Sequence, residues 1–250
     1  MRKIFYSLFI ISALAACKKD ETLRYNNLTM GNIHGEEIVS DQGNTFVITE
    51  RLFEVNLNEF ESKRVMLSCD VLRQTADKTY DIRLTGITPV LTKSIKTFEE
   101  STEEEDLSID DPVIIRDIWY AGGYINLLIE IAQKKGSTSP HYINLVYDIS
   151  AAGNGDYTFM LRHNALDEVP SEDDTEFSTG AGYVSFPISS FIKEDAANIT
   201  LKWNSHKFVG SGYSLIKTEE RSHKVKWERS GFEQNPSKSS KTVMKLSEYR

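Results

Sequence analysis

The chain has 250 residues, of which 40% are hydrophobic, and a formal net charge of −8. This length is enough to bury a core as one large domain or two small ones, and we favour two. Sequence-independent binding to nucleic acid needs clustered lysine and arginine, so the acidic balance argues against a nucleic-acid partner. Tyr, Phe, Thr, Val and Ile concentrate in short alternating runs, which predicts an all-β protein.

The N-terminus has the pattern of a secretory signal peptide. Arg2 and Lys3 precede the apolar run Ile4–Ala13, which is too short to span a bilayer. The next residues, Leu14-Ala15-Ala16-Cys17, resemble the bacterial lipobox, in which the peptide is cleaved before the cysteine and that cysteine is lipidated. We therefore expect a signal peptide over residues 1–16 and a lipid anchor, palmitate for example, on Cys17. An ordinary signal peptide followed by an incidental cysteine is the alternative.

Residues 17–29 are expected to form a tether. Several acyl chains, at about 0.8 kcal/mol per buried CH₂, would hold mature Cys17 permanently at a membrane. The tether begins with Lys18-Lys19-Asp20-Glu21, which resembles the export signals of surface lipoproteins in Gram-negative anaerobes; a solvated tether is the alternative. The predicted location is the Gram-negative outer membrane, on its periplasmic or its outer face. Once Cys17 is acylated, Cys69 has no disulfide partner, and its apolar strand predicts a core thiol.

Residues 30–95 are expected to form a small barrel of the OB type. Strands are predicted at 30–35, 44–50, 63–72 and 79–92, with a less regular piece at 52–60. The apolar parity of the last strand changes near Gly86, which predicts a β-bulge there. OB barrels often bind nucleic acid through basic grooves and stacking aromatics. Here the aromatic residues are few and the net charge is negative, which argues against that function.

Residues 96–112 are predicted to be a solvated acidic linker. Their eight carboxylates repel one another and have low strand propensity: Glu99, Glu100, Glu103, Glu104, Glu105, Asp106, Asp110 and Asp111. A calcium site is the sharper alternative, here and at the carboxylates of residues 167–176, but neither spacing matches an EF-hand loop. Pro112 marks the start of the next strand.

Residues 113–216 are predicted to form an immunoglobulin-like β-sandwich. Seven short strands are expected, at 113–120, 124–133, 141–148, 157–163, 182–188, 199–204 and 208–216. The first two form a hairpin around Gly122-Gly123, because two glycines can both take the positive φ of a type I′ turn. That turn predicts a register in which one face pairs Tyr120 with Ile125, Ile118 with Leu127, Arg116 with Ile129 and Ile114 with Ile131. The other face pairs Ala121 with Tyr124, Trp119 with Asn126, Asp117 with Leu128 and Ile115 with Glu130.

Four ordered motifs of this region resemble the NigD-like lipoproteins: Asp117–Asn126, His141–Val146, Leu161–Ala165 and Val184–Ser189. The resemblance covers residues 1–213 and implies an N-terminal OB domain and a C-terminal β-sandwich behind a lipoprotein signal. The family pattern has a residue other than proline at the position of Pro187, which leaves that strand, expected at an edge, in question. The resemblance also implies a link to a bacteriocin operon and an immunity role, but no catalytic residues.

Residues 217–250 carry nine basic and five acidic residues and no long apolar period, which predicts a disordered basic tail. The alternative is a basic segment that contacts membrane phosphates or an acidic partner.

The sequence contains no motif for catalysis or metal binding. The five histidines have no ligand spacing, and HExxH, GxSxG and Walker-type patterns are absent, so we predict no enzyme, no metal and no cofactor. His163 could join a polar cluster with Asp117 or Asp156, although a hydrogen bond to the loop that turns its strand is the favoured interpretation. Trp119, Tyr120 and Tyr124 could form an aromatic platform at the hairpin tip, or they could cap the core.

The predicted function is a binding or adaptor module of the cell envelope, with an envelope protein, a peptide or a glycan as partner. The candidate ligand-binding residues are Trp119, Tyr120, Tyr124, Arg162 and His163. An immunity protein against a bacteriocin-like toxin is the main alternative. A hydrolase, which would need a catalytic group assembled from distant strands, is the third.

Overall fold

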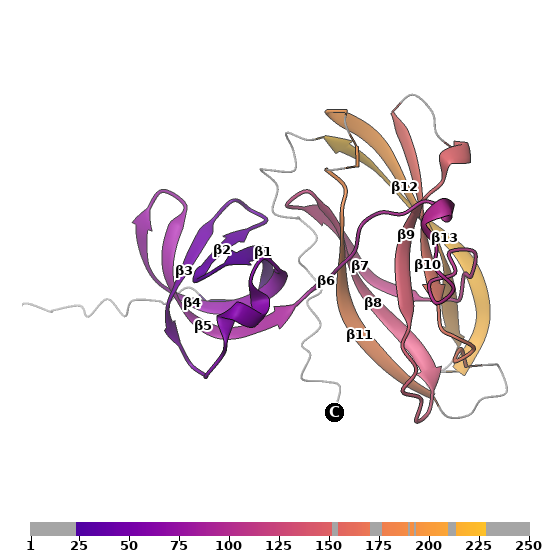
Figure 1. Cartoon of the computed structure of the whole chain (residues 1–250), viewed down its shortest axis with the longest axis horizontal. Coiled ribbons are helices and arrows are strands. Elements are labelled where there is room, and N and C mark those ends of the chain that lie inside the picture. Colours follow the sequence, from indigo (N-terminus) through magenta and orange to yellow (C-terminus); the bar gives the residue numbers. More distant parts are fainter. Residues whose placement is uncertain are drawn as a thin grey trace, which may run out of the picture.

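The computed structural model describes residues 24–151, 155–170, 177–189, 191–192, 194–209 and 214–228, which form two β domains side by side (Figure 1). In these ranges every helix is a short 3₁₀ turn, and none is long and apolar enough to cross a membrane. The predicted all-β class is confirmed.

The first domain is a closed five-stranded barrel, in agreement with the OB-type prediction. Its elements are β1 (Arg24–His34), β2 (Glu37–Ser40), β3 (Thr45–Arg51), η1 (Leu57–Phe60), β4 (Arg64–Ala76) and β5 (Thr79–Pro89). The strands follow the order β1-β2-β3-β5-β4, and β1 closes the ring on β4. β3 and β5 are parallel, whereas the other pairs are antiparallel. The four predicted strands correspond to β1, β3, β4 and β5; the short β2 was missed.

The barrel has a hydrophobic core of its own, built from Ile33, Ile38, Phe46, Ile48, Leu57, Val65, Leu67, Cys69, Ile82 and Leu84. Ser68 pairs with Gly86 while Cys69 pairs with Leu84, so the register shifts at Thr85 and the predicted bulge is confirmed. Cys69 is fully buried, and this burial raises the pKa of its thiol to about 12. Since only a thiolate is a good nucleophile, Cys69 is a core residue, as predicted.

The second domain is a sandwich of two four-stranded sheets around a separate core. Its strands are β6 (Leu91–Thr92), β7 (Ile114–Ala121), β8 (Tyr124–Lys134), β9 (Tyr142–Tyr147), β10 (Asp156–Asn164), β11 (Phe177–Pro187), β12 (Ala196–Val209) and β13 (Ser214–Glu228), with η3 (Ile149–Ala151) between β9 and β10. One sheet has the order β6-β11-β8-β7 and the other β13-β12-β10-β9. The first six predicted strands correspond to β7–β12, but the predicted strand at 208–216 is wrong, because it spans the end of β12 and the start of β13. Pro187 is the last residue of β11, where it does not interrupt the pairing with β8.

The acidic segment between the domains is an ordered strap (residues 93–113) and not a solvated linker. Leu107 is 1% exposed and Ile95 belongs to the sandwich core. Lys96 forms a β-bridge with Val146, and η2 (Phe98–Glu100) follows. Hydrogen bonds from Lys93 and then Lys96 lower the pKa of Glu105, so these lysines relieve the carboxylate repulsion that the prediction relied on.

The strands also extend beyond both predicted ends of the folded region. β1 begins at Arg24, inside the predicted tether, and β13 continues to Glu228, inside the predicted tail. β13 pairs with β12 along its length, because Val225 and Trp227 alternate toward the core and Trp227 is 2% exposed. Residues 1–23 and 229–250, including Cys17, lie outside the described residues.

Candidate functional site

The hairpin of β7 and β8 turns as predicted. Gly122 and Gly123 have φ values of 61° and 83°, and Tyr120 pairs with Ile125. The predicted pairs hold as far as Asp117, but a bulge at Arg116 then shifts the register, so Ile115 pairs with Ile129 and Ile114 with Glu130. Arg116 leaves the ladder and its Nε lies 2.7 Å from Glu130 Oε2. An ion pair at a bulge replaces the predicted contact of Arg116 with Ile129.

This hairpin tip contacts the barrel. A Cβ on Gly122 would lie 2.2 Å from Asp41 Oδ1, and one on Gly123 would lie 2.7 Å from Ser189 Oγ. Both positions thus require glycine for space as well as for backbone conformation. The tip is held between Asp41 in the barrel and the end of β11.

A buried polar cluster joins the two domains; we call Asp41, Arg64, Asn126 and Ser185 the interface cluster. Arg64 Nη1 and Nη2 donate to the two carboxylate oxygens of Asp41 at 2.8 and 2.5 Å. The same guanidinium donates across the domain boundary to Asn126 Oδ1 at 2.9 Å and to Ser185 Oγ at 3.0 Å. The side chains of Arg64 and Asp41 are only 1% and 3% exposed. Burial raises the pKa of Asp41, while the hydrogen bonds and charge of Arg64 oppose that rise.

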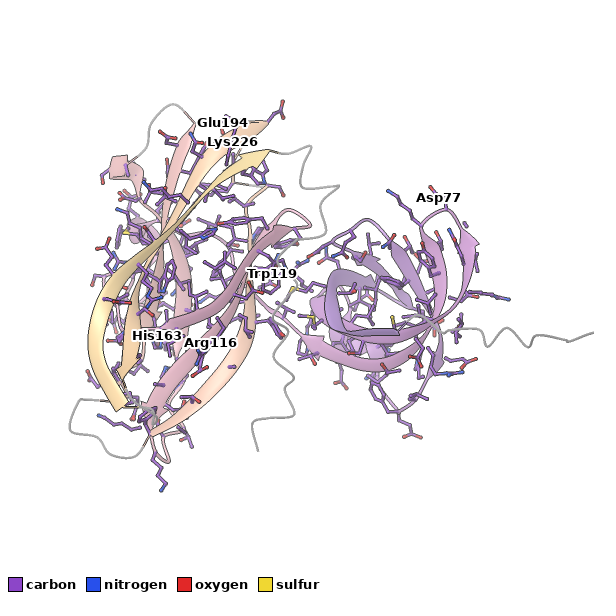
Figure 2. All side chains as sticks on the ribbon, turned by 180° about the vertical axis from the view of Figure 1, so that it is seen from behind. Asp77, Arg116, Trp119, His163, Glu194 and Lys226 are labelled. Atoms are coloured by element: carbon purple, nitrogen blue, oxygen red, sulfur yellow. The ribbon has the colours of Figure 1, made fainter. Side chains whose placement is uncertain are left out.

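The three predicted aromatic residues contact protein on different sides of the hairpin. Tyr124 lies under the guanidinium of Arg64, with 4.0 Å from its ring centroid to Cζ. Trp119 packs against a small cluster of Met30, Met66 and Val90 and forms an edge-to-face pair with Tyr183. Figure 2 shows Trp119 on the side of the sandwich that faces the barrel. These contacts make Trp119 and Tyr124 part of the domain interface.

Tyr120 is on the opposite face, against the sandwich core and stacked on His223. Burial raises the pKa of its hydroxyl. The aromatic residues therefore do not form the single platform at the hairpin tip that the sequence suggested.

His163 and His141, which are distant in sequence, form a second buried cluster that we call the histidine pair. His141 Nδ1 and His163 Nε2 are 2.8 Å apart, and the rings are stacked at 18°. His163 Nδ1 lies 3.2 Å from the carbonyl oxygen of Pro112. Because a carbonyl only accepts, His163 Nδ1 carries the proton, so Nε2 accepts from His141. The ring of His163 thus bonds the strap and a second histidine, where the favoured interpretation had the loop that turns its own strand.

The histidine pair holds the strap on the sandwich. Asp111 N donates to the His163 carbonyl at 2.9 Å, and Ala165 N donates to Asp111 Oδ2 at 2.8 Å. Burial lowers the pKa of His163 to about 4, with a smaller effect of His141. Burial also lowers the pKa of His141 and takes that of His206 to about 4. The nearby carboxylate is Asp111, and not the predicted Asp117 or Asp156.

Arg162 precedes His163 on β10 and belongs to the same attachment. It forms an ion pair with Asp110 of the strap and donates to Met160 Sδ at 3.1 Å. Figure 2 shows His163 in the sandwich, away from the barrel and from Trp119. Arg162 and His163, neighbours on β10, therefore do not join Trp119 and Tyr124 in one site. Within the ranges that the structure describes, no group of three or more His, Cys, Asp or Glu could hold a metal ion. Residues 171–176, which carry part of the second calcium alternative, lie outside those ranges.

A shallow hollow of about 460 Å³ lies on the face of β10, β12 and β13. Its lining includes Thr158, Thr200, Asn198, Asp156 and Lys224. Asn198 Nδ2 donates to Asp156 Oδ1 at 2.7 Å, so part of this polar lining is already paired. None of the predicted ligand-binding residues contributes to the hollow.

Sequence reasoning missed the interface cluster. Asp41 lies between the strands predicted at 30–35 and 44–50, and Arg64 lies at the start of the strand predicted at 63–72. One signal was present: Arg64 begins an apolar strand and needs a buried partner if its side chain faces inward. The partner itself, from a different loop, could not be deduced.

The arrangement described above has counterparts among known proteins. Residues 94–216 match the family model described as the NigD-like C-terminal beta sandwich domain. This range of the chain is similar to the NigD-like C-terminal β-sandwich domain. The predicted resemblance is confirmed. The matched range starts in the strap, which agrees with the docking of the strap on the sandwich. No protein with a curated description matches the chain.

Solved structures with the NigD-like architecture extend the likeness to both domains. A protein of unknown function from Bacteroides vulgatus has a TM-score of 0.60 at 18% identity, covering 83% of this chain and 94% of its own. A NigD-like immunity protein from Bacteroides caccae has a TM-score of 0.58 at 18% identity, and the match covers 80% of this chain and 92% of that protein. A candidate lipoprotein from Bacteroides fragilis has a TM-score of 0.56 at 13% identity, and the match covers 82% of this chain and 98% of that protein. At these identities the likeness shows the fold alone.

Proposed function

We propose that this protein is a non-enzymatic binding or adaptor module, anchored to the Gram-negative outer membrane by a lipid on Cys17. The anchor is supported by Leu14-Ala15-Ala16-Cys17 after an apolar run. A solved structure of the same architecture, from Bacteroides fragilis, is described as a candidate lipoprotein. The partner is an envelope protein, a peptide or a glycan.

The interface cluster carries this proposal. Arg64 bonds Asp41 in its own domain and Asn126 and Ser185 in the other, with almost no exposure to solvent. Such a buried, multiply bonded charge gives the two domains one fixed arrangement. A partner held by the sandwich would therefore keep a fixed position relative to the barrel, which the tether enters at β1. This is the property that an adaptor at a membrane needs.

The anchor is tested with Cys17→Ala, with Cys69→Ala as the matched control. Cys17→Ala should abolish incorporation of labelled fatty acid and release the protein from the membrane fraction, whereas Cys69→Ala should stay labelled. Continued labelling of Cys17→Ala would refute the lipobox.

Binding is tested by affinity capture of the lipidated full chain from an envelope extract. A component that is recovered reproducibly from wild type, at comparable molar amount, supports the adaptor function. The absence of any such protein, peptide or glycan would contradict it. Turnover of an envelope substrate that is lost in His163→Ala would contradict the non-enzymatic part.

Protection against a bacteriocin-like toxin is the second candidate function. The observation that favours it is the shared architecture with the NigD-like immunity protein from Bacteroides caccae. Deletion of the gene should then sensitise the cell to a toxin encoded nearby, and Cys17→Ala should not restore full resistance. Unchanged sensitivity would exclude this candidate.

A further inference from the structure

One long strand of the sandwich is paired on only one side over much of its length. β11 pairs with β8 from Phe177 to Pro187 without a shift in register. On the other side, β6 pairs only with Val184 and Ser185. Figure 1 shows the short β6 beside β11, which extends well beyond it. Among the described residues, no strand therefore pairs with the outer side of residues 178–183; we call this stretch the open edge.

The hydrogen bonds of β6 show which backbone groups face outward. Lys93 N donates to the Ser185 carbonyl at 3.2 Å, so residue 185 directs its backbone groups away from β8. The N–H and C=O of one strand residue point to the same side, and successive residues alternate. Tyr183, Ala181 and Thr179 therefore present their N–H and C=O groups on the open edge. Gly180 and Gly182 direct theirs to β8.

The open edge lacks the features that usually prevent strand addition. Proteins protect such edges with charged side chains, proline, bulges or a covering segment. Residues 178–182 are Ser-Thr-Gly-Ala-Gly, all exposed, uncharged and in regular register with β8. The other sheet is different, because the strap covers its β9 edge: Lys96 N donates to the Leu145 carbonyl and Tyr147 N donates to the Lys96 carbonyl, both at 2.9 Å.

We propose that the open edge of β11 is a docking site for an extended segment of a partner polypeptide, which adds a strand in line with β6. The inference rests on the proposed binding function and names its surface and its class of partner. The argument for a strand as occupant is continuity, since β6 already occupies the same edge through backbone pairing. Ideal Cβ positions on Gly180 and Gly182 meet no atom within 4 Å, so the faces of the sheet are uncovered at these two residues. Strand addition to a sheet edge is a known mode of peptide recognition.

The test is a pair of substitutions at one residue. Ala181→Pro removes an outward N–H and leaves the β8 bonds in place, and Ala181→Ser keeps the N–H at similar size. A photoreactive phenylalanine at Thr179 of the full, lipidated chain reports contact in cells. We expect adducts with a second polypeptide, reduced at least tenfold by Ala181→Pro and unchanged by Ala181→Ser. Far-UV circular dichroism and thermal unfolding of Ala181→Pro should match wild type, which shows that the fold is retained.

Each other outcome overturns the proposal in its own way. Adducts that persist in Ala181→Pro would show that the partner does not pair with this edge. Adducts only with a second copy of the chain, or only within the chain, would mean that the edge is covered by the protein itself. If no adduct forms but affinity capture still recovers a partner, the edge is wrong and the proposed function stands. If capture also fails, the proposed function fails with it.

Discussion

The interface cluster and the histidine pair both hold segments together that are far apart in sequence, but one uses full charges and the other neutral rings. The Asp41 carboxylate faces the guanidinium of Arg64 directly, at 2.5 Å. The histidine pair works only while His163 Nε2 is free to accept, because its other nitrogen already donates to Pro112. The domain interface should therefore depend on an intact ion pair, and the attachment of the strap on pH.

The largest effect should come from removing one partner of the interface cluster. Arg64→Ala leaves Asp41 buried without its counter-charge, which should lower the free energy of unfolding by about 3–5 kcal/mol. Denaturant unfolding would measure this loss. The matched control is the double variant Arg64→Met with Asp41→Leu, which leaves no buried charge. It should recover at least half of the free energy of unfolding that Arg64→Ala loses. A single variant that costs less than about 1 kcal/mol would show that the pair is not buried in solution.

A second way to disturb the interface is through the hairpin tip. Gly122→Ala adds a Cβ 2.2 Å from Asp41 at a φ of 61°, so backbone strain and a steric clash should together cost about 2–4 kcal/mol. Gly43→Ala is the control, since Gly43 has a φ of 75° and open space around it. Gly43→Ala should cost only about 1–2 kcal/mol in the same unfolding experiment. Equal losses for the two variants would argue against a contact between Gly122 and Asp41.

Acid should weaken the fold through the histidines. The pKa of His163 and that of His206 are about 4, lowered by burial from an ordinary value of 6.5. The stability that these neutral, buried histidines contribute is complete above pH 6.5. It is lost as the pH falls toward 4, because the unfolded chain then binds more protons than the folded chain. The expected slope is about 1.4 kcal/mol per pH unit for each excess proton. Unfolding curves between pH 7.5 and 4.5 would measure it, and a flat profile would contradict the burial of these rings.

His163→Asn should reduce this pH dependence. At neutral pH it should lower the free energy of unfolding less than the Arg64 and Gly122 variants do. The Asn amide can still donate to the Pro112 carbonyl but cannot titrate, so we expect a loss of about 1 kcal/mol at pH 7.5 and a shallower acid slope. Amide hydrogen exchange at Asp111 would show whether the strap detaches at low pH. His34→Asn, at an exposed histidine of the barrel, should leave the slope unchanged. If both variants change the slope equally, the histidine pair is not the acid-sensitive group.

The elements of this fold follow from local patterns. The alternating strands of both domains, the bulge beside Gly86 and the Gly122-Gly123 turn were all predictable, because backbone conformation and side-chain parity are set by near neighbours. β13 was missed, because Val225 and Trp227 are separated by charged residues that hide a one-sided apolar pattern. β2 has only 4 residues, too few for alternation to be recognised.

The candidate site was less predictable than the strands. Trp119 and Tyr124 were predicted to form an aromatic platform or to cap the core, but the sequence of the second domain alone could not show that the barrel contacts them. His163 was expected to bond the loop that turns its strand, but its ring bonds Pro112 of the strap and His141, which precedes it by 22 residues. No sequence spacing encodes that contact.

What the sequence determined by itself is most of the strands, their apolar faces and the division into two β domains, since these depend on residue type and period. Tertiary structure decided which charged side chains are paired or buried. The acidic segment became a strap because Lys93 and Lys96 lie next to Glu105, and Arg64 became buried because Asp41, Asn126 and Ser185 surround it. Whether a charge is solvated or buried depends on which partners the fold brings within hydrogen-bond distance, and those partners come from elsewhere in the chain.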